Sequence, residues 1–312
     1  MPNIDPIIWF FLFGMLAGAM KSELRLPSQI YDFVSMLLLL TIGLKGGIEL
    51  AKQPFLTLLP QISLVALSGF MLPFLAYPVL RSVGKMKRAD AASIAAHYGS
   101  VSVGTFAVVI AYLASREVYY EEHMALFVVI LEVPAIIIGI LLAKGLSRQM
   151  QWGKVAHEVL AGKGIMFLMG GLAIGWLSGP EGVSSISPLF FDLFKGVLAL
   201  FLLEMGLITA SQLGSLRRYG LFLIFFGLIT PLVFSLIGVG VGAYLGLSVG
   251  GTAVLATLFA SASYIAVPAA MRISVPEANP TLSLTASLGI TFPFNILVGI
   301  PLYHRISQYC LG

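Results

Sequence analysis

Long apolar runs, separated by short polar connections, follow one another along almost the whole chain. A helix needs about 20 apolar residues to cross the ~30 Å hydrocarbon layer of a bilayer, and most of the runs reach or approach that length. The runs fall at residues 7–20, 31–50, 54–80, 90–114, 123–143, 164–178, 189–211, 220–245, 250–271 and 281–303. The pattern therefore predicts an all-α membrane protein with about ten transmembrane helices.

The composition is that expected of a chain surrounded mainly by membrane lipid. Hydrophobic residues make up 58% and charged residues only 10% of the 312 residues, and mean hydropathy is +0.98, whereas a soluble domain carries about 25% charged residues. No Lys or Arg precedes the first run, so we expect a retained helix and no secretory signal. Cys310, the single cysteine, allows no internal disulfide. Without metal-ligand, phosphate-loop or nucleophile motifs, the sequence predicts neither an enzyme nor a bound cofactor.

Basic residues are distributed unevenly between alternate connections. Thirteen of the 18 Lys and Arg residues would lie on one side of the membrane. The positive-inside rule assigns that side to the cytoplasm, which places both termini outside the cytoplasm of a bacterial inner membrane. The sequence pI of about 9.1 then reflects orientation, and nucleic acid is not an expected partner. The thirteen residues are Lys21, Arg25, Arg81, Lys85, Lys87, Arg88, Lys144, Arg148, Lys154, Lys163, Arg217, Arg218 and Arg272.

The two halves of the chain resemble each other. The clearest match is Ser100-Val-Ser102, which falls 161 residues before Ser261-Ala-Ser263. Because each half has an odd number of spans, the second copy must enter the membrane from the opposite face. Such inverted-topology repeats are typical of secondary transporters. We predict five-helix repeats at 1–143 and 164–312, joined by a short basic cytoplasmic linker at 144–163.

The fourth and ninth runs are interrupted by small and hydroxyl residues at corresponding places. Non-helical backbone is tolerated inside a membrane only where protein or a wet cavity covers it, and the helix ends at such breaks can bind ions. We expect the two interrupted helices to cross near the midplane and to form the substrate site. Close packing between helices is the alternative explanation for the small residues. The predicted substrate-binding residues are Gly99, Ser100, Val101, Ser102, Gly104, Thr105, Ser261, Ala262, Ser263 and Tyr264.

One carboxylate lies in the middle of an apolar run. A charge at the bilayer centre costs ~3 kcal/mol or more, so Glu132 marks a functional site by default, with a buried structural pair as the alternative. We predict that Glu132, Thr105, Thr291 and Asn295 hold a coupling cation, with sodium on Glu132, since sodium favours oxygen ligands. Hydrogen bonding between helices is an equal alternative for Thr291 and Asn295.

Other polar residues have simpler explanations. Asp32 and Asp192 occupy corresponding places near the starts of two runs and are predicted to cap helices. Lys45 and Glu49 are spaced for a local pair on one helix. Glu204 fits a pathway residue or a structural pair equally. His97 precedes the first interruption and is interpreted as a hydrogen-bonded core residue, with proton coupling as the alternative.

At these motifs the chain resembles the family of sodium-dependent bicarbonate transporters best known from cyanobacteria. The similarity covers nearly the whole chain and is clearest at Gly99-Ser-Val-Ser-Val-Gly-Thr105, around Glu132-Val-Pro134 and at Ile300-Pro-Leu302. The resemblance implies ten helices in inverted repeats, a core domain that moves against a gate domain, and bicarbonate bound with sodium near the two interruptions. The family usually has an aspartate where this chain has Tyr264, which leaves the sodium stoichiometry open.

The residues and the resemblance together predict a secondary active transporter that imports bicarbonate coupled to sodium by alternating access. A wide apolar cavity would favour an alternative, a sodium- or proton-coupled symporter of another small organic anion on the same architecture. A non-transporting membrane receptor is a third hypothesis, which leaves the paired interruptions unexplained. Further expected partners are membrane lipid and copies of the same chain. The linker is shorter than in cyanobacterial members, so binding of their small signalling regulator stays open.

The charge asymmetry makes a testable prediction about Cys310. With both termini outside, an impermeant thiol reagent should label native Cys310 in intact spheroplasts. A Lys85→Cys variant in a Cys310→Ser background is the matched control and should be labelled only after permeabilisation. Labelling of Cys310 only after permeabilisation would overturn the topology.

Overall fold

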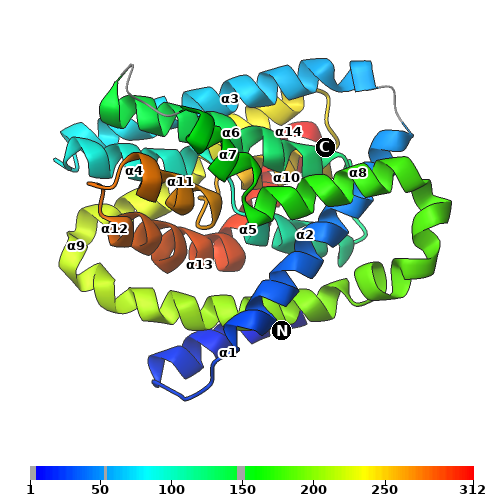
Figure 1. Ribbon diagram of the computed structural model, residues 1–312, viewed down its shortest axis with the longest axis horizontal. Coiled ribbons are helices and arrows are strands. Elements are labelled where there is room, and N and C mark those ends of the chain that lie inside the picture. Colours follow the sequence, from blue (N-terminus) through cyan, green and yellow to red (C-terminus); the bar gives the residue numbers. More distant parts are fainter. Residues whose placement is uncertain (1–4, 53–54, 146–151) are drawn as a thin grey trace.

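Helices account for nearly all of the computed structural model, which describes residues 5–52, 55–145 and 152–312. No strand occurs in these ranges. Figure 1 shows the helices arranged as one layered bundle. In chain order they are α1 Pro6–Ala19, α2 Ser28–Ala51, α3 Phe55–Ser82, α4 Arg88–Gly99, α5 Val103–Ala114, α6 Met124–Lys144, α7 Trp152–Leu160, α8 Lys163–Val183, η1 Ser184–Ile186, η2 Pro188–Asp192, α9 Phe194–Tyr244, α10 Val249–Phe259, α11 Ala266–Ser274, α12 Pro280–Leu284, η3 Thr285–Thr291, α13 Phe292–Phe294, η4 Asn295–Gly299 and α14 Ile300–Leu311.

Seven helical segments of the described chain are long and apolar enough to cross a membrane. Two shorter apolar helices, α1 and α10, accompany them. Large apolar side chains such as Trp9, Phe74 and Phe225 are exposed on the outside of the bundle, which suits lipid and not water. The chain is therefore a multi-pass, all-α membrane protein.

Two helical elements bear on the expected spans. α9 contains two helices joined by a kink at Gly220, with φ 77° and ψ 173°. The parts Phe194–Gly214 and Gly220–Tyr244 are each long and apolar enough to cross a membrane, as the runs 189–211 and 220–245 predict. Glycine adopts this left-handed φ without the steric cost that a side chain would add. Figure 1 shows α9 curving around one edge of the bundle. The predicted linker 144–163 contains the nine-residue helix α7, while its residues 146–151 lie outside the described part of the chain.

Close backbone contacts at glycine join the outer helices in two crossing pairs. α1 packs against α9, where a Cβ atom added at Gly14 would overlap the Leu203 carbonyl. α2 packs against α8, where a Cβ atom added at Gly43 would lie 2.5 Å from the Leu168 carbonyl oxygen. Small residues bring membrane helices close enough for extensive van der Waals contact. The two pairs form a scaffold beside the interrupted helices (Figure 1).

The remaining helices enclose the two interruptions. α4 packs between α3 and α6, and α10 packs between α9 and α14. The backbone of α10 also approaches α9 closely, since a Cβ atom added at Gly238 would lie 2.6 Å from Ala256 Cα. Both interruptions therefore lie inside protein, as non-helical backbone in a membrane requires.

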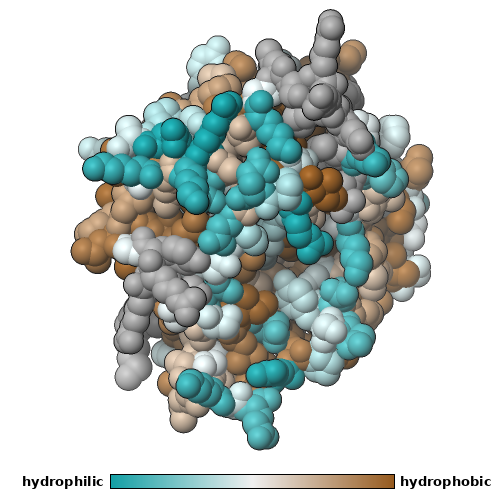
Figure 2. Space-filling model, turned by 60° about the vertical axis from the view of Figure 1, so that its left-hand side comes forward, coloured by the Kyte–Doolittle hydropathy of each residue, from teal (hydrophilic) through white to brown (hydrophobic). Residues whose placement is uncertain are grey.

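One end of the molecule carries exposed basic residues, and we call it the basic face. Figure 2 looks toward this end and shows hydrophilic side chains gathered over it. The basic face lies at the end of α3, the start of α4 and the end of α11, and its exposed residues include Arg81, Lys85, Lys87, Arg88 and Arg272.

The glycine contacts predict which substitutions the scaffold tolerates. Gly43→Ala should lower the free energy of unfolding by about 1–3 kcal/mol, because the added methyl group meets the α8 backbone. Gly170→Ala, on α8, is the matched control, since a Cβ atom there has nothing within 4 Å. Thermal unfolding in detergent measures both. Equal midpoints for the two variants would contradict the close packing of α2 on α8.

Candidate functional site

The first interruption separates α4 from α5 by three residues. Ser100 and Ser102 have extended backbone, with φ −95° and −108°. The Ser102 hydroxyl oxygen caps α5 by accepting from the Thr105 N–H at 3.0 Å and from the Thr105 hydroxyl at 2.9 Å. A Cβ atom added at Gly99 would overlap the ring of Pro73, so α3 packs closely against this end of α4. The segment is non-helical because a serine cap begins a new helix here.

The second interruption separates α10 from α11. Its serine hydroxyls form hydrogen bonds with nearby backbone groups of α10 and α11. The Ser261 hydroxyl donates to the Leu258 carbonyl at 2.8 Å, and the Ser263 hydroxyl accepts from the Val267 N–H at 3.5 Å. Pro268 then lies in the first turn of α11, where a missing N–H costs little.

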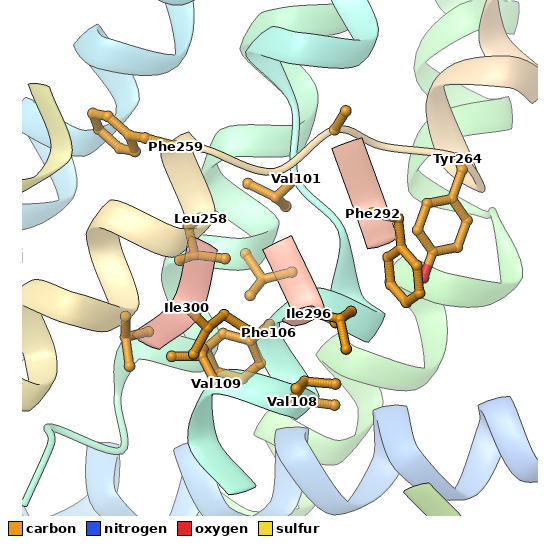
Figure 3. Packing of buried hydrophobic residues seen from close by; sticks show 14 of the residues in the cluster. Val101, Phe106, Val108, Val109, Leu258, Phe259, Tyr264, Phe292, Ile296 and Ile300 are labelled. Carbon is orange, nitrogen blue, oxygen red and sulfur yellow. The ribbon is translucent and has the colours of Figure 1, made fainter. Parts of the chain in front are cut away.

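The two interruptions are hydrogen-bonded to each other. The Ser102 N–H donates to the Ser261 hydroxyl oxygen at 2.9 Å, and the Ser263 N–H donates to the His97 carbonyl at 2.8 Å. Figure 3 shows the chain from Phe259 to Tyr264 passing beside Val101. The structure thus brings the predicted serines together. The second non-helical segment satisfies a backbone N–H of the first, and the last turn of α4 satisfies a backbone N–H of the second.

Apolar side chains fill the space around this crossing. Figure 3 shows Phe106, Ile296 and Leu258 below it and Phe292 against Tyr264, whose rings meet edge to face at 5.7 Å between centroids. Only a void of about 10 Å³ touches Gly104. This is about the volume that a single water probe occupies. The space beside Gly104 is therefore closely packed.

Two hydroxyls at the crossing remain unsatisfied among the described residues. The Ser100 and Tyr264 oxygens are buried without a hydrogen-bond partner. The Tyr264 oxygen approaches Ser102 and the Gly104 backbone without reaching hydrogen-bond geometry. Buried polar groups are normally bonded, so unsatisfied ones next to a helix start indicate a place for a polar ligand.

Glu132 is buried on α6, with 5% of its surface exposed. Within the described part of the chain, no hydrogen bond or ion pair reaches its carboxylate. Ala135, one helical turn later on the same face, packs against Gly99 at the first interruption. A buried carboxylate without a partner is costly unless a proton or a cation neutralises it. The described residues contain no cluster of three or more His, Cys, Asp or Glu side chains that could hold a metal ion.

The other predicted cation ligands are bonded elsewhere. The Thr291 hydroxyl donates to the Gly227 carbonyl at 2.8 Å and pairs with the Tyr98 hydroxyl at 2.6 Å. Asn295 donates to the Ala260 carbonyl at 2.9 Å and accepts from the Tyr303 hydroxyl at 2.7 Å. In this structure both residues join helices, and Asn295 fixes the end of α10 just before the second interruption.

Three local predictions about charged residues are wrong. Asp32 does not cap α2, because that helix begins a turn earlier at Ser28, and Asp32 pairs with Lys163 at 3.2 Å. Asp192 makes no capping hydrogen bond to α9. Glu49 pairs with Lys52 at 2.8 Å, while the Lys45 ammonium lies over two aromatic rings, those of Phe191 and Phe194.

Glu204, an open candidate for a pathway residue, accepts from the Leu26 N–H at 3.3 Å and so holds the connection between α1 and α2.

Sequence reasoning missed two acidic residues that position the interrupted helices. Glu121 accepts from the Ser248 N–H at 2.8 Å and from its hydroxyl at 3.0 Å at the start of α10. Asp90, in the first turn of α4, accepts from the Asn279 N–H at 2.8 Å. The Ser248 cap before Val249-Gly-Gly was a local signal for the start of α10, but its partner lies 127 positions away.

Buried, hydrogen-bonded interruptions in two helices of a multi-pass membrane protein are typical of membrane transporters. Comparison with known families agrees. The model of the Na+-dependent bicarbonate transporter superfamily matches residues 6–308. The chain belongs to this superfamily and is a membrane transporter by family. A search of curated proteins finds no significant match.

Proposed function

We propose that this protein imports bicarbonate together with sodium by alternating access. The observation that carries the proposal is the crossing itself, where two interruptions bond to each other and leave the Ser100 and Tyr264 hydroxyls unsatisfied. Hydroxyls and the N–H groups at the start of α5 are the donors that a small oxyanion needs. The family name supports bicarbonate and sodium as the transported pair.

Size at the crossing favours a small anion. The void at Gly104 is only about 10 Å³, so bicarbonate would need less opening there than an anion with a hydrocarbon body. Bicarbonate would bind between the amides and hydroxyls at residues 99–105 and those at 261–264. The apolar side chains around them would exclude water and strengthen each hydrogen bond.

A second candidate function has one observation in its favour. A cavity of about 400 Å³ lies between α2, α8 and Ile265, lined mostly by apolar residues such as Leu39 and Phe167. A cavity of this kind suits the body of an organic anion. We rank this candidate below bicarbonate, because the unsatisfied hydroxyls lie at the narrow crossing. Competition by organic carboxylates against bicarbonate uptake would distinguish the two.

We propose two inverted five-helix repeats as the architecture. The crossing pairs support this, since α1 meets α9 at Gly14 and Gly206 much as α8 meets α2 at Gly171 and Gly43. The acidic contacts support it too, because the connection before α6 is bonded to the start of α10, and the connection before α12 to the start of α4. Helices α1, α2, α8 and the first part of α9 would form the gate, and the others the moving core.

Sodium coupling would depend on Glu132. Carboxylate oxygens suit a hard cation, and a carboxylate alone would repel bicarbonate. A sodium ion beside Glu132 would neutralise it and attract the anion, so each ligand would raise the affinity for the other by the same factor. Tyr264 cannot supply a second carboxylate, which leaves Glu132 as the charged group for this role.

The cellular setting remains part of the proposal. We place the protein in the bacterial cytoplasmic membrane with both termini outside, on the distribution of Lys and Arg. A homo-oligomer stays a prediction, and binding of a small signalling regulator stays open.

The central experiment is uptake of labelled bicarbonate into proteoliposomes with and without an inward sodium gradient. We expect uptake above that of empty liposomes, increased by sodium. No difference from empty liposomes, with correctly folded protein, would refute bicarbonate transport.

The serines at the crossing should act as one site. Ser102→Ala and Ser263→Ala should each raise the bicarbonate concentration for half-maximal uptake about tenfold, as expected for the loss of a hydrogen bond to a charged ligand, worth about 1.5–3 kcal/mol. The double variant should be non-additive, because contacting groups share their partners. Ser274→Ala, which removes a buried hydroxyl at the far end of α11, is the control, and thermal unfolding checks each fold. Additive effects would indicate separate locations.

Glu132→Gln should alter the response to sodium. The substitution keeps the shape of the side chain and removes its charge, so the sodium concentration for half-maximal uptake should rise roughly tenfold or more, or sodium dependence should vanish. Bicarbonate affinity at saturating sodium should change far less. Uptake measured across a sodium series gives both quantities. An unchanged sodium response would mean that Glu132 is structural.

A further inference from the structure

A second cavity lies beside α4 and α11, near the basic face. It has a volume of about 120 Å³ and a mostly apolar lining, in which Pro268, Met271, Val275, Pro276, Ala278 and Pro280 accompany the polar residues Ser93, His97 and Arg272. The liquid volume of one water is about 30 Å³. The cavity therefore has room for one anion of the size of bicarbonate.

His97, one of the lining residues, has an unused hydrogen-bond acceptor. Its Nδ1 lies 2.7 Å from the Ser93 carbonyl oxygen, which can only accept, so Nδ1 carries a hydrogen and Nε2 of the neutral imidazole carries a lone pair. The side chain is 1% exposed, and Nε2 has no partner among the described residues. A buried acceptor of this kind requires a ligand with a hydrogen to donate.

Arg272 offers the same cavity a positive charge. It is the cationic residue of the lining, is exposed at the basic face, and has no ion pair within the described ranges. Asp90 lies one turn before Ser93 on α4, but it is outside the lining and accepts from the Asn279 N–H. A guanidinium without a carboxylate partner favours an oxyanion.

We propose that this cavity is a second binding site for a small oxyanion that carries one hydroxyl hydrogen, and we assign it to bicarbonate. The anion would place its charged oxygens at Arg272 and donate its hydroxyl hydrogen to His97 Nε2. The inference rests on the proposed function, because it takes the transported anion as the ligand of a site separate from the crossing.

This site is linked to the crossing through one residue. The His97 carbonyl accepts from the Ser263 N–H at 2.8 Å, and His97 is also one of the residues that line the cavity. A bound anion would also join α4 to α11, the helices that carry the two interruptions. Occupancy of the cavity therefore stabilises the crossing in the geometry seen here.

Equilibrium binding of radiolabelled bicarbonate to the purified protein at saturating sodium and fixed pH tests the site. We expect two bicarbonate ions per chain. At a bicarbonate concentration just sufficient to fill both wild-type sites, Arg272→Gln, at an exposed position that should not disturb folding, should leave one. Ser102→Ala, whose crossing site is weakened about tenfold, should bind clearly fewer than two. Lys87→Gln is the matched control, since it removes an exposed charge from the basic face without touching the cavity, and it should leave two.

Nitrate provides a test that needs no change at His97. It has the planar shape and charge of bicarbonate but no hydrogen to donate. In Ser102→Ala, excess nitrate should displace the remaining bicarbonate at least tenfold less effectively than unlabelled bicarbonate does. Equal displacement would overturn the role of His97. One ion per chain in the wild type, or two in Arg272→Gln, would overturn the second site alone. No binding to the wild type would refute the proposed function, and the second site with it.

Discussion

Backbone N–H and C=O groups that leave a helix inside a membrane have no water to bond, and each unsatisfied group costs several kcal/mol. This constraint explains the centre of the molecule. The interruption after Gly99 is stable because the Ser102 N–H finds the Ser261 hydroxyl, and the interruption after Phe259 is stable because the Ser263 N–H finds the His97 carbonyl. Neither segment can be understood alone, since each supplies partners for the other.

The same constraint gives the surrounding helices their roles. Asn295 bonds the carbonyl of Ala260 at the end of α10, and Tyr303 in turn fixes Asn295. At the outer ends, Glu121 and Asp90 hold connections against the starts of α10 and α4. Glycine contacts, such as that of Gly43 in α2 with the backbone of α8, let the scaffold helices pack closely against each other. Ser100, Tyr264 and His97 are among eight described residues with a buried side-chain polar atom that has no hydrogen-bond partner.

Two charged residues without an ion-pair partner also mark places where an ion could bind. Glu132 is buried and Arg272 is exposed, and neither has an ion pair within the described residues. Burial makes the isolated Glu132 carboxylate expensive, whereas exposed Arg272 costs little to leave unpaired. A cation at the first and an anion at the second would each remove an uncompensated charge. Coupled transport of two oppositely charged ions is consistent with both.

Apolar run lengths by themselves determined the all-helical membrane class, because the thickness of the bilayer imposes a length on each helix. Clusters of Gly and Ser inside runs 90–114 and 250–271 likewise revealed both interruptions, since such residues are poor helix formers. Only the tertiary structure decided the partners: Thr291 and Asn295 bond between helices, Asp32 pairs with Lys163, and Glu121 reaches Ser248. These contacts join residues far apart in sequence, and a hydrogen-bond partner depends on distance and direction in space, which no local pattern encodes.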